Sequence, residues 1–327
     1  YFGGGTPSFV EPAEIASMLA RCRELFEPAA FVETTLEANP ESITPDRAAS
    51  WLEAGVNRLS IGVQSLQDRV LRPRGRMYGA QEAIEACARA RRAGFGNLGV
   101  DLILGLPGET AQSFAHGLDR VVTEVSPEHI SIYIIETEEA GKHTALTRAV
   151  NEGQERLLAE DDIAEAYLAA LDRLAASGYR HYEISNFCRP GAESRHNTKY
   201  WTGDPYLGVG PSAHSLAGGR RVGRPDDLQG WIDWIIRAEL ETGIQTGDYT
   251  LEDDQARARE ALVLALRLID GVDLDRFSAE WGPVTLDRLA PTFADLARDG
   301  LVTRGEERIA LTRRGLLLAN EVFARLV

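Results

Sequence analysis

Short segments with the alternation of β-strands recur along the first part of the chain, and a helical pattern separates successive segments. The expected strands are Phe31–Glu37, Arg58–Gln64, Leu98–Leu104 and His129–Ile135. Pro45–Ala54 is predicted to be a helix, with Thr44 as its N-cap and Gly55 at its end, and Gln81–Ala93 is a second helix before Gly94. Crossovers long enough to hold a helix indicate parallel strands. Their repetition in one direction predicts a barrel or part of one.

One face of these strands is unusually polar for a barrel. Leu59, Ile61 and Val63 share one face of their strand, because side chains alternate along an extended chain. The opposite face carries Glu33, Thr35 and Glu37 in the first strand and Ser60, Gly62 and Gln64 in the second. In the third strand it carries Gly99, Asp101 and Ile103. Ordinary eight-stranded barrels fill their interior with branched apolar side chains. Polar and small residues there instead predict an open lumen that holds a ligand.

The second half of the chain has a different character. A helix over Asp161–Ala176 precedes a strand-like Y-R-H-Y-E-I-S-N-F and a Gly-rich turn region at Tyr206–Ser215. Beyond about Arg220 the pattern predicts the helices Leu228–Glu241, Gln255–Ile269 and Leu286–Arg298, then a hairpin and a last helix. This ending is winged-helix-like, a design that serves DNA binding or protein contacts. We expect two domains, residues 1–219 and 220–327.

The totals exclude several classes of protein. A net charge of −15 argues against nucleic acid as a partner, since phosphate binding needs clustered Lys and Arg. No apolar run approaches the ~20 residues that span a bilayer. Cys22, Cys87 and Cys188 lie too far apart for a disulfide framework or a self-contained zinc site, so buried free thiols in a reducing cytosol are expected. Tyr1 and Phe2 resemble the last residues of a strand whose beginning lies outside this chain.

Polar residues gather at or near the expected ends of successive strands. Glu37, Gln64 and Asp101 join a Gly3–Thr6 turn and the loop residue Arg76 on the face where such barrels bind ligands. Glycines let a ligand approach the main chain closely, carboxylates accept from hydroxyl or ammonium groups, and Arg binds a carboxylate. Singly, Glu37 could cap a helix, Gln64 could be a satisfied core amide and Asp101 could hold a loop. Together they suit a ligand with ribose and amino-acid ends.

Four motifs carry a resemblance to a known family: Y-F-G-G-G-T-P-S, L-E-A-N-P, G-V-N-R-L-S-I-G-V-Q-S and D-L-I-L-G-L-P-G-E-T. They resemble radical S-adenosylmethionine (SAM) proteins of the oxygen-independent coproporphyrinogen III oxidase type. The resemblance implies an α/β fold, an incomplete (β/α)₆ barrel with a mostly helical, winged-helix-like C-terminal domain. It also implies that SAM binds to Gly4, Gly5, Thr6, Glu37, Gln64, Arg76 and Asp101.

Two departures from the family pattern stand out. The C-x₃-C-x₂-C motif that holds the family's [4Fe–4S] cluster precedes G-G-G-T-P, and no cysteine of this chain matches it. The stretch L-R-P-R-G-R-M-Y-G keeps Arg76 in phase, but Tyr78 stands where the family has a histidine, and Pro73-Arg74 alters the turn. The cluster ligands are therefore expected outside this chain, and an enzymatic activity stays uncertain.

The segment S-R-H-N-T-K-Y-W separates branches of the family. Its H-N-x-x-Y-W pattern, after Y-E-I-S-N-F, resembles the haem chaperone (HemW-like) branch, which implies delivery of haem to respiratory haem proteins. The haem candidates are His196, Asn197, Tyr200 and Trp201, with His196 as the iron ligand. In a helix, His196 and Tyr200 share a face, as do Asn197 and Trp201.

Alternatives to this interpretation stay open. His196 and its aromatic neighbours would also serve as a structural plug, and His214 is a competing iron ligand. The oxidase itself, which decarboxylates coproporphyrinogen III by radical chemistry, is the alternative function. Beyond haem and its acceptor proteins, the chain is expected to reach membranes at most peripherally, and a homodimer is a further expectation.

Overall fold

Four parallel strands make up most of the six-stranded sheet in the first part of the chain. They are β1 (Thr35–Ala38), β2 (Arg58–Gln64), β3 (Leu98–Leu104) and β4 (His129–Ile134), in the order β1-β2-β3-β4-β6-β5. The computed structural model describes residues 1–27, 32–135, 145–218, 220–240 and 253–327. Strands β2 and β3 occupy the predicted residues, β4 is one residue shorter, and β1 begins later than expected. Phe2 adds a parallel bridge to Leu36 beside β1, which confirms the strand character expected of the first residues.

The last two strands of the sheet correct one expectation. The segment 179–187 was expected to be a single strand, but it forms a hairpin of β5 (Arg180–Glu183) and β6 (Asn186–Cys188). Strand β6 pairs antiparallel with both β5 and β4. The alternation through this segment contains no Gly or Pro to mark a turn. The Glu183 carboxylate makes the turn, since it accepts from the Ser185 N–H at 2.9 Å and from the Asn186 amide.

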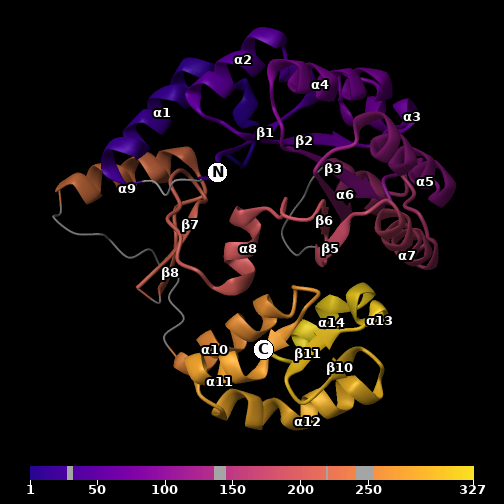
Figure 1. Ribbon diagram of the computed structural model, residues 1–327, viewed down its shortest axis with the longest axis vertical. Helices are drawn as coiled ribbons and strands as arrows, with labels where there is room; N and C mark the ends of the chain where they lie inside the picture. The colour runs from indigo at the N-terminus through magenta and orange to yellow at the C-terminus, as the bar shows by residue number, and fades with distance from the viewer. Residues whose placement is uncertain (28–31, 136–144, 219, 241–252) are drawn as a thin grey trace. The chain divides into compact units, whose positions relative to one another are not determined.

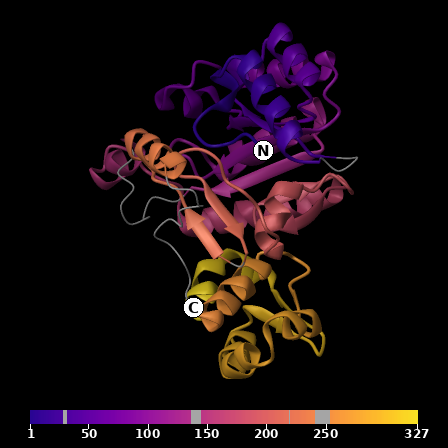
Figure 2. The same cartoon turned by 90° about the vertical axis from the view of Figure 1, so that its left-hand side faces the viewer.

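Helices cover the outer face of this sheet, as Figure 1 shows, and Figure 2 shows the indigo and purple helices on one side of the strands. They are α1 (Pro12–Leu25), α2 (Pro45–Ala54), α3 (Asp68–Leu71), α4 (Ala80–Ala93), α5 (Ala111–Arg120), α6 (Ala145–Asn151) and α7 (Glu160–Ala176). Helix α2 starts and ends as predicted: the Thr44 hydroxyl accepts from the Arg47 N–H at 3.2 Å, and Gly55 closes it with φ 100°.

The two faces of the strands divide as their parity predicts. Leu59, Ile61 and Val63 are all buried, and Trp51 of α2 is fully buried in the same unit. Burying a large apolar side chain stabilises a fold by about 1.5–3 kcal/mol, so this outer layer holds the strands in register. The opposite face of β2 is left for polar groups.

Residues Tyr1–Ser194 and Arg195–Val327 form two compact units. The second unit contains α8 (Arg195–Thr202), β7 (His214–Ala217), β8 (Arg220–Gly223), α9 (Leu228–Leu240), α10 (Asp254–Ala265), β9 (Val272–Asp273), α11 (Leu274–Trp281), α12 (Val284–Arg298), β10 (Val302–Arg304), β11 (Arg308–Leu311), α13 (Arg313–Leu317) and α14 (Ala319–Ala324). The predicted domain boundary at residues 219 and 220 falls inside this unit, and that division stays a prediction.

The end of the chain has the predicted helix, hairpin and helix. Helix α12 leads into the β10–β11 hairpin, β9 adds antiparallel to β11, and α13 follows. One apolar cluster holds these elements together, with Leu262, Phe293 and Val322 at its centre. Helix α10 ends at Ala265, four residues before the predicted end, and α12 begins two residues earlier than predicted. The last residue of the expected helix Leu228–Glu241 lies outside the described residues.

Glu109 joins the ends of β2 and β3. One of its carboxylate oxygens accepts from the Ser65 hydroxyl at 3.2 Å, and the other accepts from the Gly105 N–H at 3.0 Å. The side chain is buried. Burial raises the pKa of Glu109 to about 7, although the hydrogen bonds from Gly105 and Ser65 oppose that rise. Folding therefore costs more when this carboxyl is charged.

The Glu109 carboxyl predicts a pH dependence of stability. Between about pH 4.5 and pH 7 the folded state binds the Glu109 proton more tightly than the unfolded state. The free energy of unfolding should then fall as the pH rises through that window, by up to about 3 kcal/mol from this group. Glu109→Gln cannot titrate, so urea unfolding should show a flatter dependence over the same range. Equal slopes for the two proteins would contradict this assignment.

Candidate ligand pocket and aromatic cluster

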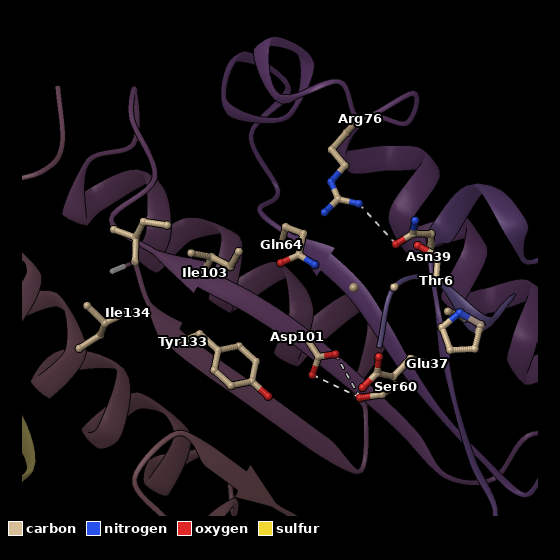
Figure 3. Close-up of a pocket in the computed structure, with 15 residues that line it drawn as sticks. Thr6, Glu37, Asn39, Ser60, Gln64, Arg76, Asp101, Ile103, Tyr133 and Ile134 are labelled. Carbon is tan, nitrogen blue, oxygen red and sulfur yellow. Dashed lines mark hydrogen bonds between the residues drawn. The ribbon is translucent and has the colours of Figure 1, made fainter. Parts of the chain in front are cut away.

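A cavity of about 400 Å³ opens at the carboxyl ends of the parallel strands (Figure 3). Six of the seven residues expected to bind SAM line it: Gly5, Thr6, Glu37, Gln64, Arg76 and Asp101. The seventh, Gly4, donates its N–H to the Glu37 carboxylate at 3.2 Å. The structure therefore brings together residues that lie up to about a hundred positions apart in the chain, because parallel strands end at one edge of the sheet.

Glu37 fastens the Gly-rich turn to β1. Its Oε1 accepts from the Tyr1 hydroxyl at 2.7 Å, and its Oε2 accepts from Gly4. The alternative of Glu37 as a helix cap is wrong, because Thr44 caps the next helix. Gly4 and Gly5 have φ values of 75° and 56°, and a Cβ built at either would meet nothing within 4 Å among the described residues. The turn thus leaves its main chain open to a ligand.

Asp101 is half-buried in the floor of the pocket. The Ser60 hydroxyl lies 3.1 and 3.3 Å from its two carboxylate oxygens, as the dashed lines in Figure 3 mark. Burial raises the pKa of Asp101, while the Ser131 hydroxyl and the Arg58 guanidinium act to lower it. Asp101 lies in the middle of β3, so the alternative that it holds a loop is wrong.

Gln64 and Arg76 lie on the other side of the pocket. Figure 3 shows both side chains beside Asn39, whose Oδ1 accepts from Arg76 Nη1 at 3.4 Å. Gln64 ends β2 with φ 66°, a left-handed conformation that non-glycine residues seldom adopt. Its side chain lines the cavity, which is against the alternative of an enclosed core amide.

Nine further lining residues were not predicted as site residues from the sequence, and three of these have polar side chains: Asn39, Ser60 and Tyr133. Parity could have found Ser60, which shares a strand face with Gln64. It could also have found Tyr133, which lies on β4 two residues after Ser131. Asn39 follows β1 directly and carries no signal beyond that position.

The donor set of the pocket fits an amino acid joined to a nucleoside. Glu37 and Asp101 can accept from ammonium or ribose hydroxyl groups, and Arg76 can bind a carboxylate. The described residues offer no comparable set of metal ligands. Across the residues that the structure describes, no group of three or more His, Cys, Asp or Glu side chains could hold a metal ion. The described residues therefore do not fit an iron–sulfur cluster.

The histidine–aromatic motif forms a helix of the second unit. On α8 the rings of His196 and Tyr200 meet edge to face with centroids 4.8 Å apart, as expected for residues one turn apart. Tyr200 also meets Tyr206 at 4.6 Å. Tyr206 in turn accepts a hydrogen bond from Arg221 at 2.9 Å. These four residues, which we call the His196 cluster, combine an imidazole with two phenol rings and a cation.

Trp201 lies beside the His196 cluster, with its ring centroid 6.3 Å from that of Tyr200. The Arg267 guanidinium lies 4.4 Å from the centroid of the Trp201 ring, and the indole lines a cavity of about 260 Å³ with Phe277 and Trp281. The indole therefore contacts Tyr200 and also packs toward α10 and α11. The competing ligand His214 is exposed at the start of β7, with its ring against Gly223.

Comparisons with known proteins agree with this architecture. Residues 1–121 match the radical SAM superfamily, and residues 253–318 match the HemN C-terminal domain. A solved structure of coproporphyrinogen III oxidase (HemN) from Escherichia coli is similar with a TM-score of 0.80 and 26% identity, covering 99% of this chain and 76% of that one. The radical SAM family implies SAM and a [4Fe–4S] cluster.

Relatives in other bacteria are more similar in sequence. The heme chaperone HemW of Bacillus subtilis is 33% identical over 99% of this chain and 83% of its own length. The heme chaperone HemW of Mycobacterium tuberculosis strain H37Rv is 35% identical over 100% of this chain and 80% of its own length. With this likeness along its whole length, the chain belongs to the HemW family of radical SAM proteins.

Proposed function

We propose that this chain binds haem and passes it to haem-accepting respiratory proteins, on a barrel that also binds SAM. The observation that carries the proposal is the His196 cluster in a chain related to heme chaperones along its whole length. A neutral imidazole is a common axial ligand of haem iron, and phenol rings supply broad contact to a macrocycle. His196 would ligate the iron, and Tyr200 would pack beside it. Asn197 and Trp201 are lesser candidates for contact with haem.

The pocket of the first unit would hold SAM. Arg76 would bind the methionine carboxylate, the turn at Gly4 to Thr6 would meet the amino group, and Asp101 or Glu37 would accept from ribose. When bound with a cluster, SAM supplies radical chemistry in this family. Among the described residues no side chain is assigned as a cluster ligand, so the role of this chain in the site is to bind and orient SAM.

The three cysteines are free, which supports a reducing, cytoplasmic place for the protein. Cys87 and Cys188 are buried as expected, and burial raises the pKa of each to about 12, so these two thiols are inert. Cys22 is exposed, and the expectation that it is buried was wrong. No described helix is both long and apolar enough to cross a membrane. Peripheral membrane contact and a homodimer remain part of the proposal.

A second candidate function is the oxidative decarboxylation of coproporphyrinogen III. The structural likeness to HemN favours it, but the identity is lower than to the heme chaperones. Anaerobic assay of the protein with its cluster separates the two functions. Formation of protoporphyrinogen would favour the oxidase, and its absence together with haem binding would favour the chaperone.

The first prediction concerns SAM. Asp101→Asn keeps the shape of the side chain but removes its charge, so the affinity for SAM should fall about ten-fold or more, as expected for a lost charged hydrogen bond. Stability is measured alongside, because the change also removes a carboxylate that lies near the buried Arg58 charge. Calorimetric titration measures the affinity. Asp119→Asn, which alters an outer pair with Arg173, is the control. Unchanged affinity in Asp101→Asn would remove Asp101 from the site.

The second prediction concerns haem. His196→Ala should weaken haem binding at least ten-fold and shift the Soret band, since the axial imidazole is lost. His214→Ala is the matched variant and should bind haem like the wild type. If instead only His214→Ala loses haem, the ligand is His214. Unchanged spectra and affinity in both variants would contradict a histidine ligand in this part of the chain.

A further inference from the structure

The end of β2 contains a strained turn beside the pocket. Gln64 has φ 66°, and the Ser65 N–H donates to the Val63 carbonyl at 2.8 Å, which closes a three-residue turn around Gln64. Such turns with a positive central φ are rare and cost conformational energy. The pairing of β2 with β3 shifts register at the same place, between Gly62 and Gln64. A strained residue inside a ligand pocket suggests that its neighbours hold it there.

Gly62 leaves room for the Gln64 side chain. A Cβ built at Gly62 would lie 2.8 Å from Gln64 Nε2 and 3.6 Å from Asn39 Oδ1. The Gln64 amide therefore folds back over Gly62 and lies close to the Asn39 side chain, which holds Arg76 (Figure 3). The Gln64 amide is the pocket group whose position depends directly on the shape of this turn.

The Tyr78 side chain hydrogen-bonds to the main chain of this turn. Its side chain is buried, and its hydroxyl donates to the Gly62 carbonyl at 2.8 Å, with the Val63 carbonyl at 3.4 Å. The Val63 carbonyl also accepts from the Ser65 N–H, so the Tyr78 hydroxyl binds the main chain where the turn and the register shift coincide. Burial raises the pKa of Tyr78 to about 12, which keeps the hydroxyl protonated as a donor. Ser65 is held from the other side by Glu109.

We propose that Tyr78 is a positioning residue for SAM, which acts by fixing the turn that presents the Gln64 amide to the pocket. This inference rests on the proposed binding of SAM. Tyr78 itself does not appear among the residues lining the cavity. The effect of Tyr78 on the ligand must therefore pass through the turn. Gly62 contributes to the same positioning, because its lack of a side chain leaves room for the Gln64 amide.

A double-mutant cycle tests this coupling. The variants are Tyr78→Phe, Gln64→Ala and both together, with the affinity for SAM measured by calorimetric titration. Tyr78→Phe removes only the hydroxyl and should weaken binding about five-fold, the worth of a typical hydrogen bond. In the Gln64→Ala background the same change should have almost no further effect, because the group that Tyr78 positions is gone.

Tyr179→Phe is the matched control. Its hydroxyl is also buried and donates to a main-chain carbonyl, that of Pro127 at 2.7 Å, but it lies away from the pocket residues. This variant should lose comparable stability and keep the affinity for SAM. Loss of affinity in both tyrosine variants alike would show a general effect of reduced stability and would overturn the proposal.

Other outcomes are equally decisive. Unchanged affinity in Tyr78→Phe, or an equal loss with and without Gln64, would overturn the proposal while leaving the SAM site intact. Absence of SAM binding by the wild type would overturn the proposed function and this inference together. If Tyr78→Phe fails to fold, Gly62→Ala takes its place in the cycle, since its methyl group would displace the Gln64 amide. It should likewise weaken binding, and additivity with Gln64→Ala would overturn the proposal.

Discussion

The register of the four parallel strands determines everything else in the first unit. It sets Ser60 beside Gly99 and Asp101 beside Ser131, so that one face of the sheet is polar. Arg58 is fully buried on that face and contacts the Thr35 hydroxyl at 3.4 Å. A buried cation is tolerated only with opposite charge nearby, and Arg58 indeed lowers the pKa of Asp101 against the effect of burial. The pocket therefore rests on a balanced set of buried charges.

Much of this arrangement follows from alternation along single strands. The residues of β2 and β3, the ends of α2 and the pocket residues Glu37, Gln64 and Asp101 could be predicted because periodicity and parallel topology together decide which side chains meet. The lining residues Gly5, Thr6 and Arg76 lie in loops, and the family resemblance of their motifs implied their place in the site. The β5–β6 hairpin could not, because the Glu183 carboxylate makes its turn and no local sequence signal marks it. Trp201 could not be placed either. Its neighbour Arg267 lies 66 positions away, and helical spacing says nothing of such a contact.

The same reasoning explains the arrangement of the motif around His196. Residues one turn apart on α8 meet, which spacing predicts, and so His196 and Tyr200 form one cluster. Tyr206 joins them through the loop that follows, and Arg221 joins from β8. The next residue along the helix, Trp201, keeps its ring centroid 6.3 Å from that of Tyr200 and lies against Arg267 as well, because neighbours in a helix lie about 100° apart. Tyr200 is therefore the ring that links the imidazole of His196 to the indole of Trp201.

Function in the first unit is obtained at the expense of local stability. Gln64 takes a left-handed backbone, Asp101 is a carboxyl that burial disfavours, and Glu109 is another. Each costs free energy that a glycine or a neutral side chain would save. The costs gather on the pocket side of β2 and β3 and just beyond their carboxyl ends, while the outer faces of these strands are uniformly apolar and buried. A well-packed outer layer can hold a strained inner one, so strain and binding groups occur together on the pocket side of the sheet.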